Sequence, residues 1–440
     1  MRTLLVMCAA AVAACRTLAA APTAGQPDFH GQAVELVAKM ELEEKVLQLC
    51  FDAPAIERLD VPKYNWWNEC LHGVARAGLA TVFPQAIGMA AAFDRELMHR
   101  VGETISDEAR AKYNDFSARG QRNIYQGLTF WTPNINIFRD PRWGRGMETY
   151  GEDPYLTGEL ATGFIKGLQG DDPNYFKTVA TAKHFVVHSG PEQGRHSFDA
   201  RTSPRDFYET YTPHFRKAIE QGGVWSIMCA YNRYEGEACC GSPFLDDLLR
   251  NKWGFRGYIV SDCGAIEDVY HRKAHELVKT AAEASVLGIR GGTDLCCGNA
   301  YEELLSAVRD GLIEEREVDR SVVRLMEARL RLGLHAPQGT PYDGISLDVV
   351  DSPKHRTLSL ETARKSMVLL RNEGQLPLDR KIRRIAVIGP NADSPEMQLG
   401  NYNGFPSYVV TALEGIRRKF PRAEVVYAPG CALADGMPLF

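Results

Sequence analysis

Charge of one sign is nowhere concentrated in this 440-residue sequence. It contains 51 lysine and arginine residues against 56 aspartate and glutamate residues, which gives a formal net charge of −5, and neither sign forms a long run. Proteins that bind nucleic acids or anionic membrane surfaces need a concentrated basic face. We therefore expect neither a nucleic acid partner nor electrostatic binding to a membrane.

The short motifs of several common enzyme classes are also missing. No two cysteines have the C-x-x-C spacing of a zinc or redox site, and there is no G-x-G-x-x-G fingerprint, P-loop or G-x-S-x-G elbow. His271 and His275 are four residues apart but lack the glutamate of an H-E-x-x-H zinc site, so they are better interpreted as exposed polar residues. We expect no metal and no cofactor.

Long apolar runs are missing too, except at the N-terminus. Arg2 precedes an apolar run over residues 4–14, which is too short to span a bilayer and is typical of a signal peptide. Residues 1–21 fit an ordinary signal peptide that is cleaved after small residues, whereas residues 12–15 resemble a lipoprotein box whose signal ends before Cys15. Both alternatives predict export, either as a periplasmic or secreted protein or as an outer-membrane lipoprotein held through Cys15.

The number of cysteines is odd. Of the eleven cysteines, Cys8 and Cys15 fall in the predicted signal, and nine remain. An odd number in an oxidising compartment leaves at least one thiol outside any intramolecular disulfide. The sequence does not show which cysteines pair.

Apolar strand-like runs alternate with helical patterns through the first three quarters of the chain. The predicted strands cover residues 129–137, 178–185, 224–231, 258–260 and 289–295. The predicted helices cover residues 31–50, 94–113 with Asp94 as N-cap, 205–221, 243–253, 274–287 and 301–312, followed by a last helix that contains Val318. This alternation indicates parallel βα units.

Polar residues recur where the predicted strands end, at Lys183-His184, Tyr231, Asp262 and Asp294. A (β/α)8 barrel collects its site at the carboxyl ends of its strands, whereas a doubly wound sheet has one switch point. The pattern therefore favours an α/β fold with a (β/α)8-like TIM barrel over residues 29–335.

A second unit follows the barrel. Residues 336–356 are rich in proline, glycine and aspartate and are predicted to be a linker. Residues 357–440 contain a helix at 357–370 and then a strand, a helix and a strand, which predict the start of an α/β sandwich domain. These elements are too few to complete a sheet, so the domain is expected to be truncated.

The stretch from Tyr258 to Ala265 is the strongest candidate for a catalytic centre. Its β-branched and aromatic residues predict a short buried strand that ends in Asp262, and the small residues after it allow a ligand to approach the backbone. Asp262 is therefore predicted to be a nucleophile, and the alternative is that it caps the following helix. Trp66 and Trp67, beside Glu69, suit stacking on a sugar, and packing at the edge of the core is the alternative.

Taken together, five motifs resemble glycoside hydrolase family three and occur in that family's order over about residues 30–440. They are Trp66-Trp67-Asn68-Glu69, Asp140-Pro141-Arg142-Trp143-Gly144-Arg145, Lys183-His184-Phe185, Met228-Cys229-Ala230-Tyr231-Asn232 and Ser261-Asp262-Cys263-Gly264. The resemblance implies a barrel followed by a six-stranded sandwich, and a retaining exo-glycosidase. It implies that Asp262 is the nucleophile and that the first sugar subsite is lined by Glu69, Arg145, Lys183, His184 and Tyr231, with Met228 beside it.

Two departures from the commoner β-glucosidase pattern narrow the expected substrate. The sequence has Glu69 where glucosidases usually have aspartate, and Cys263 where they usually have tryptophan, as in the β-xylosidase branch of the resembled family. The longer acid at Glu69 would shrink the subsite for a hydroxymethyl group. We therefore expect an enzyme that removes β-D-xylosyl units from xylo-oligosaccharides, with α-L-arabinofuranosidase side activity. A β-glucosidase is the alternative.

A retaining glycosidase needs a second carboxyl as acid/base, about 5–5.5 Å from the nucleophile. In the resembled family this residue is a glutamate deep in the sandwich domain, so it is not expected in this chain. Glu148, Glu152 and Asp199 are carboxylates in predicted barrel loops, but none matches the family's acid. The sequence therefore also allows a truncated chain that binds sugar without turnover.

Overall fold

The computed structural model describes residues 27–190, 192–334, 339–434 and 436. The predicted signal peptide, residues 1–21, and the predicted lipoprotein cysteine, Cys15, lie outside the described residues. Among the residues that are described, no helix is both long and apolar enough to cross a membrane.

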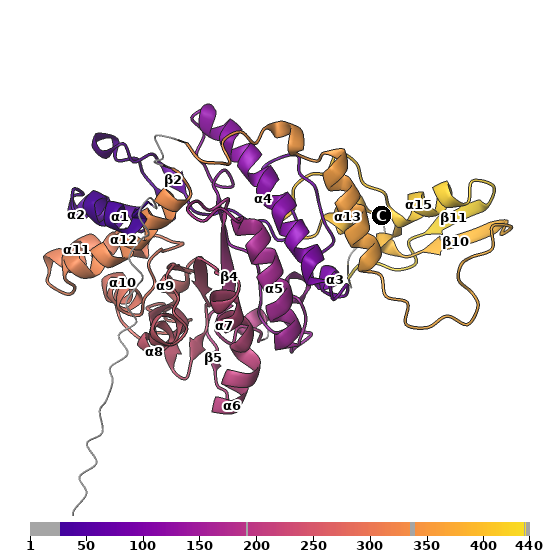
Figure 1. The fold of residues 1–440 in the computed structure, drawn as a ribbon. Coiled ribbons are helices and arrows are strands. Elements are labelled where there is room, and N and C mark those ends of the chain that lie inside the picture. The colour runs from indigo at the N-terminus through magenta and orange to yellow at the C-terminus, as the bar shows by residue number, and fades with distance from the viewer. Residues whose placement is uncertain (1–26, 191, 335–338, 435, 437–440) are drawn as a thin grey trace, which may run out of the picture.

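A parallel sheet forms the centre of the larger unit (Figure 1). Its strands follow the order β3 (Thr129–Phe130), β4 (Val179–Phe185), β6 (Ser226–Cys229) and β9 (Tyr258–Ser261). Every residue of these strands is buried. Strands that are covered on both faces are continuous apolar runs, which is why these segments could be recognised in the sequence.

Shorter pairings extend the sheet into a closed ring. Leu295 pairs with Val260, and Cys296 pairs with Cys50, in both cases in parallel. The ring continues through the antiparallel pair β1 (Asp52–Ala53) and β2 (Tyr64–Asn65), and Asn68 then returns it to β3 by a parallel bridge to Phe130. The predicted α/β barrel is therefore confirmed, with one antiparallel pairing that the alternation of strands and helices does not predict.

Helices cover the outside of the barrel. The longest are α4 (Arg95–Ala118), α5 (Pro154–Gln169) and α12 (Glu315–Arg331), and the side chain of Asp94 caps α4 as predicted by accepting from the Leu97 N–H at 2.9 Å. Helices α4 and α5 can pack closely because residue 167 is a glycine. A Cβ atom at this position would lie only 2.2 Å from the carbonyl oxygen of His99. The other described helices and strands of this unit are α1 (Phe29–Val37), α2 (Leu42–Gln48), α3 (Ala86–Ala90), β5 (Asp199–Ala200), α6 (Pro204–Asp206), α7 (Pro213–Glu220), β7 (Arg233–Tyr234), β8 (Glu237–Ala238), α8 (Pro243–Asp247), α9 (Ala265–Asp268), α10 (Ala281–Arg290) and α11 (Leu304–Arg309).

Some predicted elements are wrong in extent or type. The predicted helix 31–50 is two helices, because Glu41 and Glu44 form a capping box that starts α2. The predicted strand 289–295 is wrong: α10 continues to Arg290, and within that stretch only Leu295 pairs with a neighbouring strand. An apolar run of this length fits the end of a buried helix as well as it fits a strand.

The smaller unit contains a parallel pair of strands, as predicted (Figure 1). Strand β10 (Arg384–Ile388) pairs with β11 (Glu424–Ala428), and α14 (Pro395–Leu399) and α15 (Ala412–Lys419) lie between them in the chain. The predicted helix 357–370 is shifted, because α13 spans Pro353–Lys365 and so begins inside the predicted linker. This helix packs on α3 and α4 of the barrel, where the guanidinium of Arg100 forms a 2.5 Å ion pair with Glu361.

A loop of the smaller unit also contacts the barrel. The N–H of Arg76 donates to the carbonyl of Asn403 at 2.9 Å, and the N–H of Ala80 donates to the carbonyl of Phe405 at 3.0 Å. The buried ring of His72 lies with its Nε2 atom 3.1 Å from the carbonyl oxygen of Asn401. These backbone contacts bring residues 401–405 beside the barrel loop that carries Glu69.

Candidate active site

Asp262 lies at the carboxyl end of β9, as predicted. Its N–H donates to the carbonyl of Cys229 at 3.2 Å, which continues the ladder between β6 and β9 beyond the paired residues Cys229 and Ser261. After Asp262 the chain turns through Gly264, whose φ of +83° lies in the left-handed region that glycine adopts readily. Only 8% of Asp262 is exposed, so its carboxylate is largely shielded from solvent.

The two carboxylate oxygens of Asp262 have different surroundings. Oδ1 accepts a hydrogen bond from the backbone N–H of Cys263 at 2.8 Å. Oδ2 is buried, and no group of the described chain donates to it in hydrogen-bonding geometry. A buried carboxylate oxygen without a donor is costly in a folded protein, so Oδ2 is available to interact with a ligand.

The protonation of His184 follows from its partners. The amide of Asn136 is oriented by two backbone contacts: its Nδ2 donates to the carbonyl of His184 at 2.8 Å, and its Oδ1 accepts from the N–H of His184 at 2.9 Å. The same Oδ1 lies 2.8 Å from the ring Nδ1, which must therefore be the protonated nitrogen. Burial, together with the charges of Arg145 and Lys183, holds the pKa of His184 well below its ordinary value. The ring is thus neutral, and its Nε2 is an acceptor.

Arg145 is the cation nearest to this histidine. Its Nη1 donates to Nε2 of His184 at 3.0 Å, and its Nη2 donates to Glu148 at 2.8 Å. Burial would lower the pKa of Arg145, but the carboxylates of Glu148 and Asp262 more than offset it and raise the pKa overall. For Glu148, burial raises the pKa, and the guanidinium outweighs burial, so the pKa lies below its ordinary value.

Lys183 and Glu69 form a second buried pair at the barrel mouth. The ammonium of Lys183 donates to both carboxylate oxygens of Glu69, at 3.0 and 3.2 Å, and Glu69 also accepts from the hydroxyl of Thr132 at 3.1 Å. Both residues are almost fully buried, with exposed fractions of 3% and 2%. Burial raises the pKa of Glu69 to about 7, although the charge of Lys183 opposes the rise.

The remaining predicted residues lie on two neighbouring strands or just beyond them. Tyr231 is buried two residues beyond β6, and burial followed by the charge of Asp262 raises the pKa of its phenol. Met228 is buried in β6 and pairs with Lys183 on one side and Val260 on the other. The structure thus brings the predicted residues together at one end of the barrel, while their roles toward a sugar stay predictions.

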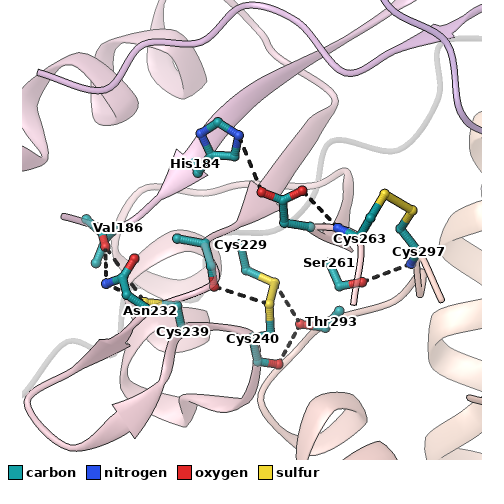
Figure 2. The surroundings of a disulfide bond; sticks show 12 residues. His184, Val186, Cys229, Asn232, Cys239, Cys240, Ser261, Cys263, Thr293 and Cys297 are labelled. Atoms are coloured by element: carbon teal, nitrogen blue, oxygen red, sulfur yellow. Dashed lines mark hydrogen bonds and ion pairs between the residues drawn. A yellow bond between two sulfur atoms is a disulfide. The ribbon is translucent and has the colours of Figure 1, made fainter. Parts of the chain in front are cut away.

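Cys263 is part of a disulfide rather than a free side chain. Its Sγ is bonded to that of Cys297, and a second disulfide joins Cys229 to Cys240 (Figure 2). Two hydrogen bonds from backbone N–H groups reinforce the first link: Gly264 donates to the carbonyl of Cys297 at 2.7 Å, and Cys297 donates to the side-chain hydroxyl of Ser261 at 2.9 Å. The segments on both sides of Asp262 are therefore fixed to the loop after Leu295.

The two tryptophans of the early loop pack into the core. Trp66 is fully buried and meets Tyr64 and Tyr258 edge to face. Trp67 is partly buried and stacks on Trp131 at a centroid distance of 5.4 Å. Of the two alternatives for Trp66, sugar stacking is wrong and packing in the core is confirmed, because a ring with no exposed area cannot stack on a ligand.

Sequence reasoning missed Asn136, the role of Glu148 as partner of Arg145, and Tyr402. Asn136 follows the cis Thr132–Pro133 peptide bond, in a stretch that was expected to be a strand. Tyr402 comes from the smaller unit, and its only signal is the polar, turn-like run that continues to Gly404. Within residues 27–434 as described, no group of three or more histidine, cysteine, aspartate or glutamate side chains is arranged to hold a metal ion.

Two family models match this chain. The glycosyl hydrolase family 3 N-terminal domain matches residues 52–328, and the glycosyl hydrolase family 3 C-terminal domain matches residues 367–432. The first match contains each of the predicted site residues.

Individual proteins support the same grouping. A xylan 1,4-β-xylosidase of Xylanibacter ruminicola is 44% identical over 413 residues, which cover 92% of this chain and 48% of that protein. A β-xylosidase/α-L-arabinofuranosidase of Medicago sativa subsp. varia is 39% identical over 90% of this chain and 52% of its own length. A solved family 3 exo-β-xylosidase, XlnD in complex with a xylobiose aziridine activity-based probe, superimposes with a TM-score of 0.86 at 34% identity over 93% of this chain and 54% of that one. The chain thus spans about half the length of these relatives.

Proposed function

The chain belongs to glycosyl hydrolase family 3, and on that premise we propose that it is a retaining exo-acting glycoside hydrolase. Its substrates are xylo-oligosaccharides, from whose non-reducing ends it removes β-D-xylosyl units. Proteins to which the chain is similar carry the names xylan 1,4-β-xylosidase and β-xylosidase/α-L-arabinofuranosidase. An α-L-arabinofuranosidase side activity is part of the proposal.

The observation that carries the proposal is the asymmetry of the Asp262 carboxylate. Oδ1 is held by the N–H of Cys263, whereas Oδ2 is buried and lacks a donor. An oxygen in this state is a suitable nucleophile, since no hydrogen bond must break before it attacks. Arg145 and Lys183 supply hydrogen-bond donors and positive charge at the same end of the barrel.

The proposed chemistry has two displacements. Oδ2 of Asp262 attacks the anomeric carbon of the terminal sugar, and the bond to the leaving oxygen breaks as an ester forms. The leaving oxygen takes a proton from a general acid and departs as an alcohol. Water then attacks the same carbon, loses its proton to the conjugate base, and releases the sugar and the free carboxylate with net retention.

We assign the acid/base role to no carboxyl group of the described chain. Both oxygens of Glu69 accept from Lys183, and Glu148 is paired with Arg145, so neither is free to protonate a leaving group. The test therefore uses a substrate whose leaving group needs no general acid. A dinitrophenolate leaves without protonation, so a dinitrophenyl glycoside reports on Asp262 whether or not an acid is present.

The preference for a pentose rests on two features around the nucleophile. The buried Glu69–Lys183 pair occupies one side of the site, and the Cys263–Cys297 disulfide lies directly beside Asp262. Both reduce the space for the additional hydroxymethyl group of a hexose. This supports β-xylosides over β-glucosides as substrates.

The experiment compares 2,4-dinitrophenyl β-D-xyloside, β-D-glucoside and α-L-arabinofuranoside as substrates of the 440-residue chain. We expect the xyloside to have the highest kcat/KM, and we expect Asp262→Asn to lower the rate of sugar transfer by at least about a thousandfold. Glu152→Gln, an exposed carboxylate in a barrel loop, is the matched control and is expected to keep full activity. Equal rates for wild type and Asp262→Asn would overturn the proposal.

We propose further that residues 1–21 direct the chain out of the cytoplasm, with Cys15 as the anchoring residue if lipidation occurs. The support is the short apolar run after Arg2. Fractionation of cells that express the natural chain or Cys15→Ala tests this. Retention of the natural chain in the cytoplasm would contradict export, and release of only the Cys15→Ala variant into the soluble fraction would support a lipid anchor.

A further inference from the structure

Cys50 and Cys296 lie opposite each other where the barrel closes. They are partners in a parallel bridge, which we call the seam. Two backbone hydrogen bonds fix this pairing: the N–H of Phe51 donates to the carbonyl of Cys296 at 3.0 Å, and the N–H of Cys296 donates to the carbonyl of Leu49 at 2.9 Å. The seam thus joins the first segment of the barrel to a segment that follows it by more than two hundred residues along the chain.

The spacing across the seam matches that of a disulfide. Neighbouring strands lie about 4.8 Å apart, and the side chains of paired residues point to the same face of the sheet. The Cα atoms of a disulfide are separated by about 4.4–6.8 Å. The two disulfides of the structure have Cα separations of 5.1 and 4.4 Å, so the barrel already contains links of this span. A bond between Cys50 and Cys296 therefore requires no displacement of the backbone.

Both side chains are thiols in the structure. Cys296 has no exposed area, and Cys50 is 8% exposed. The sulfur of Cys50 is turned toward the carbonyl oxygen of Val46, 3.9 Å away, so the bond requires a rotation about the χ1 torsion of Cys50. The two sulfurs are close enough to interact, because burial raises the pKa of Cys296 and the charges of Glu267 and of a Cys50 thiolate raise it further.

The residue next to Cys296 already belongs to a disulfide. Cys297 is bonded to Cys263, which directly follows Asp262 (Figure 2). Successive residues of an extended segment point to opposite faces, so Cys296 points away from this link and toward the face that it shares with Cys50. The two adjacent cysteines thus have separate partners on opposite sides of the segment.

We propose that Cys50 and Cys296 form a third disulfide, which closes the barrel covalently at the seam. The oxidant is a second disulfide, such as that of oxidised glutathione or of a thiol–disulfide oxidoreductase. The thiolate of Cys50 attacks one sulfur of the oxidant, forms a mixed disulfide and releases the first thiol of the oxidant. The thiolate of Cys296 then attacks the sulfur of Cys50 and releases the second thiol. The protein gives up two electrons and two protons, and the oxidant takes them up as it becomes two thiols.

The bond forms while the barrel is still open. Burial, with the charges of Glu302 and Glu267, raises the pKa of Cys50 to about 12, so the reactive thiolate is rare once the barrel has closed. During folding both thiols are exposed to solvent and to the oxidant. The reaction requires neither a sugar nor turnover, so this inference is independent of the proposed glycosidase activity.

The expected effect of the link is on stability. A disulfide restricts the unfolded chain, and the restriction increases with the length of the loop that it closes. The loop from Cys50 to Cys296 spans more than half of the chain. The link also joins two segments that local structure does not hold together, because residues 50 and 296 belong to opposite ends of the barrel sequence.

The test produces the full chain in the bacterial periplasm, an oxidising compartment, and in a cytoplasm that keeps thiols reduced. Free thiols are blocked with N-ethylmaleimide in denaturant, and the protein is digested without reduction. In the periplasmic protein, mass spectrometry is expected to find a peptide pair joined through Cys50 and Cys296, with the label on Cys70, Cys239 and Cys431. The pair is expected to be absent from the cytoplasmic protein. Label on Cys50 and Cys296 of the periplasmic protein, or a link from Cys296 to Cys263, would overturn the inference.

Thermal unfolding of two periplasmic variants provides the second readout. Cys50→Ala removes the link, and its unfolding temperature is expected to lie about 5 °C below that of Cys239→Ala. Cys239→Ala is the matched control, because Cys239 is also a buried thiol beside a disulfide-bonded residue, Cys240, but its sulfur faces the carbonyl of Val186 at 3.7 Å rather than a second thiol. The difference between the variants therefore reports the link and not the loss of a buried sulfur. Equal unfolding temperatures would overturn the stabilising role of the link.

Discussion

The Nε2 atom of His184 lies 3.5 Å from Oδ2 of Asp262, but the two atoms do not form a hydrogen bond. Asn136 fixes the proton on Nδ1, and Arg145 donates to the only lone pair of Nε2, so the histidine has no proton to donate to the carboxylate. The contact is therefore not an ion pair. The positive charge near Asp262 comes from Arg145, and His184 acts as a neutral spacer that orients this guanidinium.

The first prediction concerns the proton on His184. Because its pKa lies well below the ordinary value, the ring is expected to be neutral at neutral pH, with a protonated Nδ1. Nitrogen-15 chemical shifts of histidine-labelled protein measure this directly. A shift typical of a protonated Nε2 at neutral pH would contradict the hydrogen-bond arrangement.

The same depressed pKa has a consequence for stability. In the unfolded state the histidine has a pKa near 6.5 and is protonated at acid pH, whereas the folded ring stays neutral. The native state therefore binds fewer protons than the unfolded state at acid pH. The contribution of His184 is therefore present above about pH 6.5 and is lost as the pH falls. His184→Gln is expected to weaken the pH dependence of the free energy of unfolding below about pH 6.5. The same pH dependence in wild type and variant would contradict a lowered pKa of His184 in the folded state.

The second prediction concerns Glu69, whose pKa is raised to about 7. Between about pH 4.5 and 7 the folded acid holds a proton that the unfolded acid has lost, so its contribution to stability falls as the pH rises through this window. Glu69→Gln mimics the protonated acid. We expect the variant to gain stability relative to wild type as the pH rises from 4.5 to 7, by roughly 3 kcal/mol at most. Urea denaturation at several pH values measures the difference, and a relative loss by the variant would show that the ion pair with Lys183 outweighs burial.

The third prediction concerns the choice of sugar. Glu69→Asp shortens the acid by one methylene and opens space on the side that would hold a hydroxymethyl group. We expect the ratio of kcat/KM for β-glucoside to that for β-xyloside to rise about tenfold, which is the usual effect of one methylene in a binding site. Glu152→Asp, at an exposed position, serves as the control and is expected to leave the ratio unaltered. A ratio that stays the same in Glu69→Asp would remove Glu69 as a determinant of specificity.

The fourth prediction concerns the disulfide beside the nucleophile. The Cys263–Cys297 link closes a loop with a sequence separation of 34 residues. Replacement of both cysteines by alanine is expected to lower the free energy of unfolding by about 2–4 kcal/mol. It is also expected to lower kcat, because the segment around Asp262 loses a tether.

The control for this variant is Cys431→Ala, which changes an exposed cysteine outside both disulfides. We expect it to alter neither the free energy of unfolding nor kcat. A double alanine variant with wild-type kcat would show that the hydrogen bonds of Gly264 and Ser261 alone hold the nucleophile in place.

Much of the barrel and of its site could be predicted from the sequence. Strands such as β9 are short apolar runs that end in polar residues, and strand ends converge on one face of a barrel, so Lys183, Tyr231 and Asp262 could be placed together. The N-cap Asp94 of α4 could also be predicted from the sequence, because its side chain accepts a hydrogen bond from the first turn of the same helix.

The errors have a common physical origin in contacts between distant segments. The run at 289–295 has the composition of a strand, but tertiary packing extends α10 to Arg290. The sequence left sugar stacking and packing at the edge of the core both open for Trp66, and only the fold shows that Tyr64 and Tyr258 enclose it. The ring of Tyr402 lies 5.2 Å from Nζ of Lys183, and this contact could not be predicted from sequence, because more than two hundred residues separate the two along the chain.

The central claim is that Asp262 becomes covalently linked to a sugar, and trapping of that intermediate tests it most directly. A 2-deoxy-2-fluoro xyloside with a dinitrophenolate leaving group glycosylates the nucleophile and hydrolyses slowly. After digestion, mass spectrometry is expected to find one fluoroxylosyl group on the peptide that contains Asp262, and none in Asp262→Asn. A label on a peptide that lacks Asp262, or an equal label in Asp262→Asn, would contradict the account.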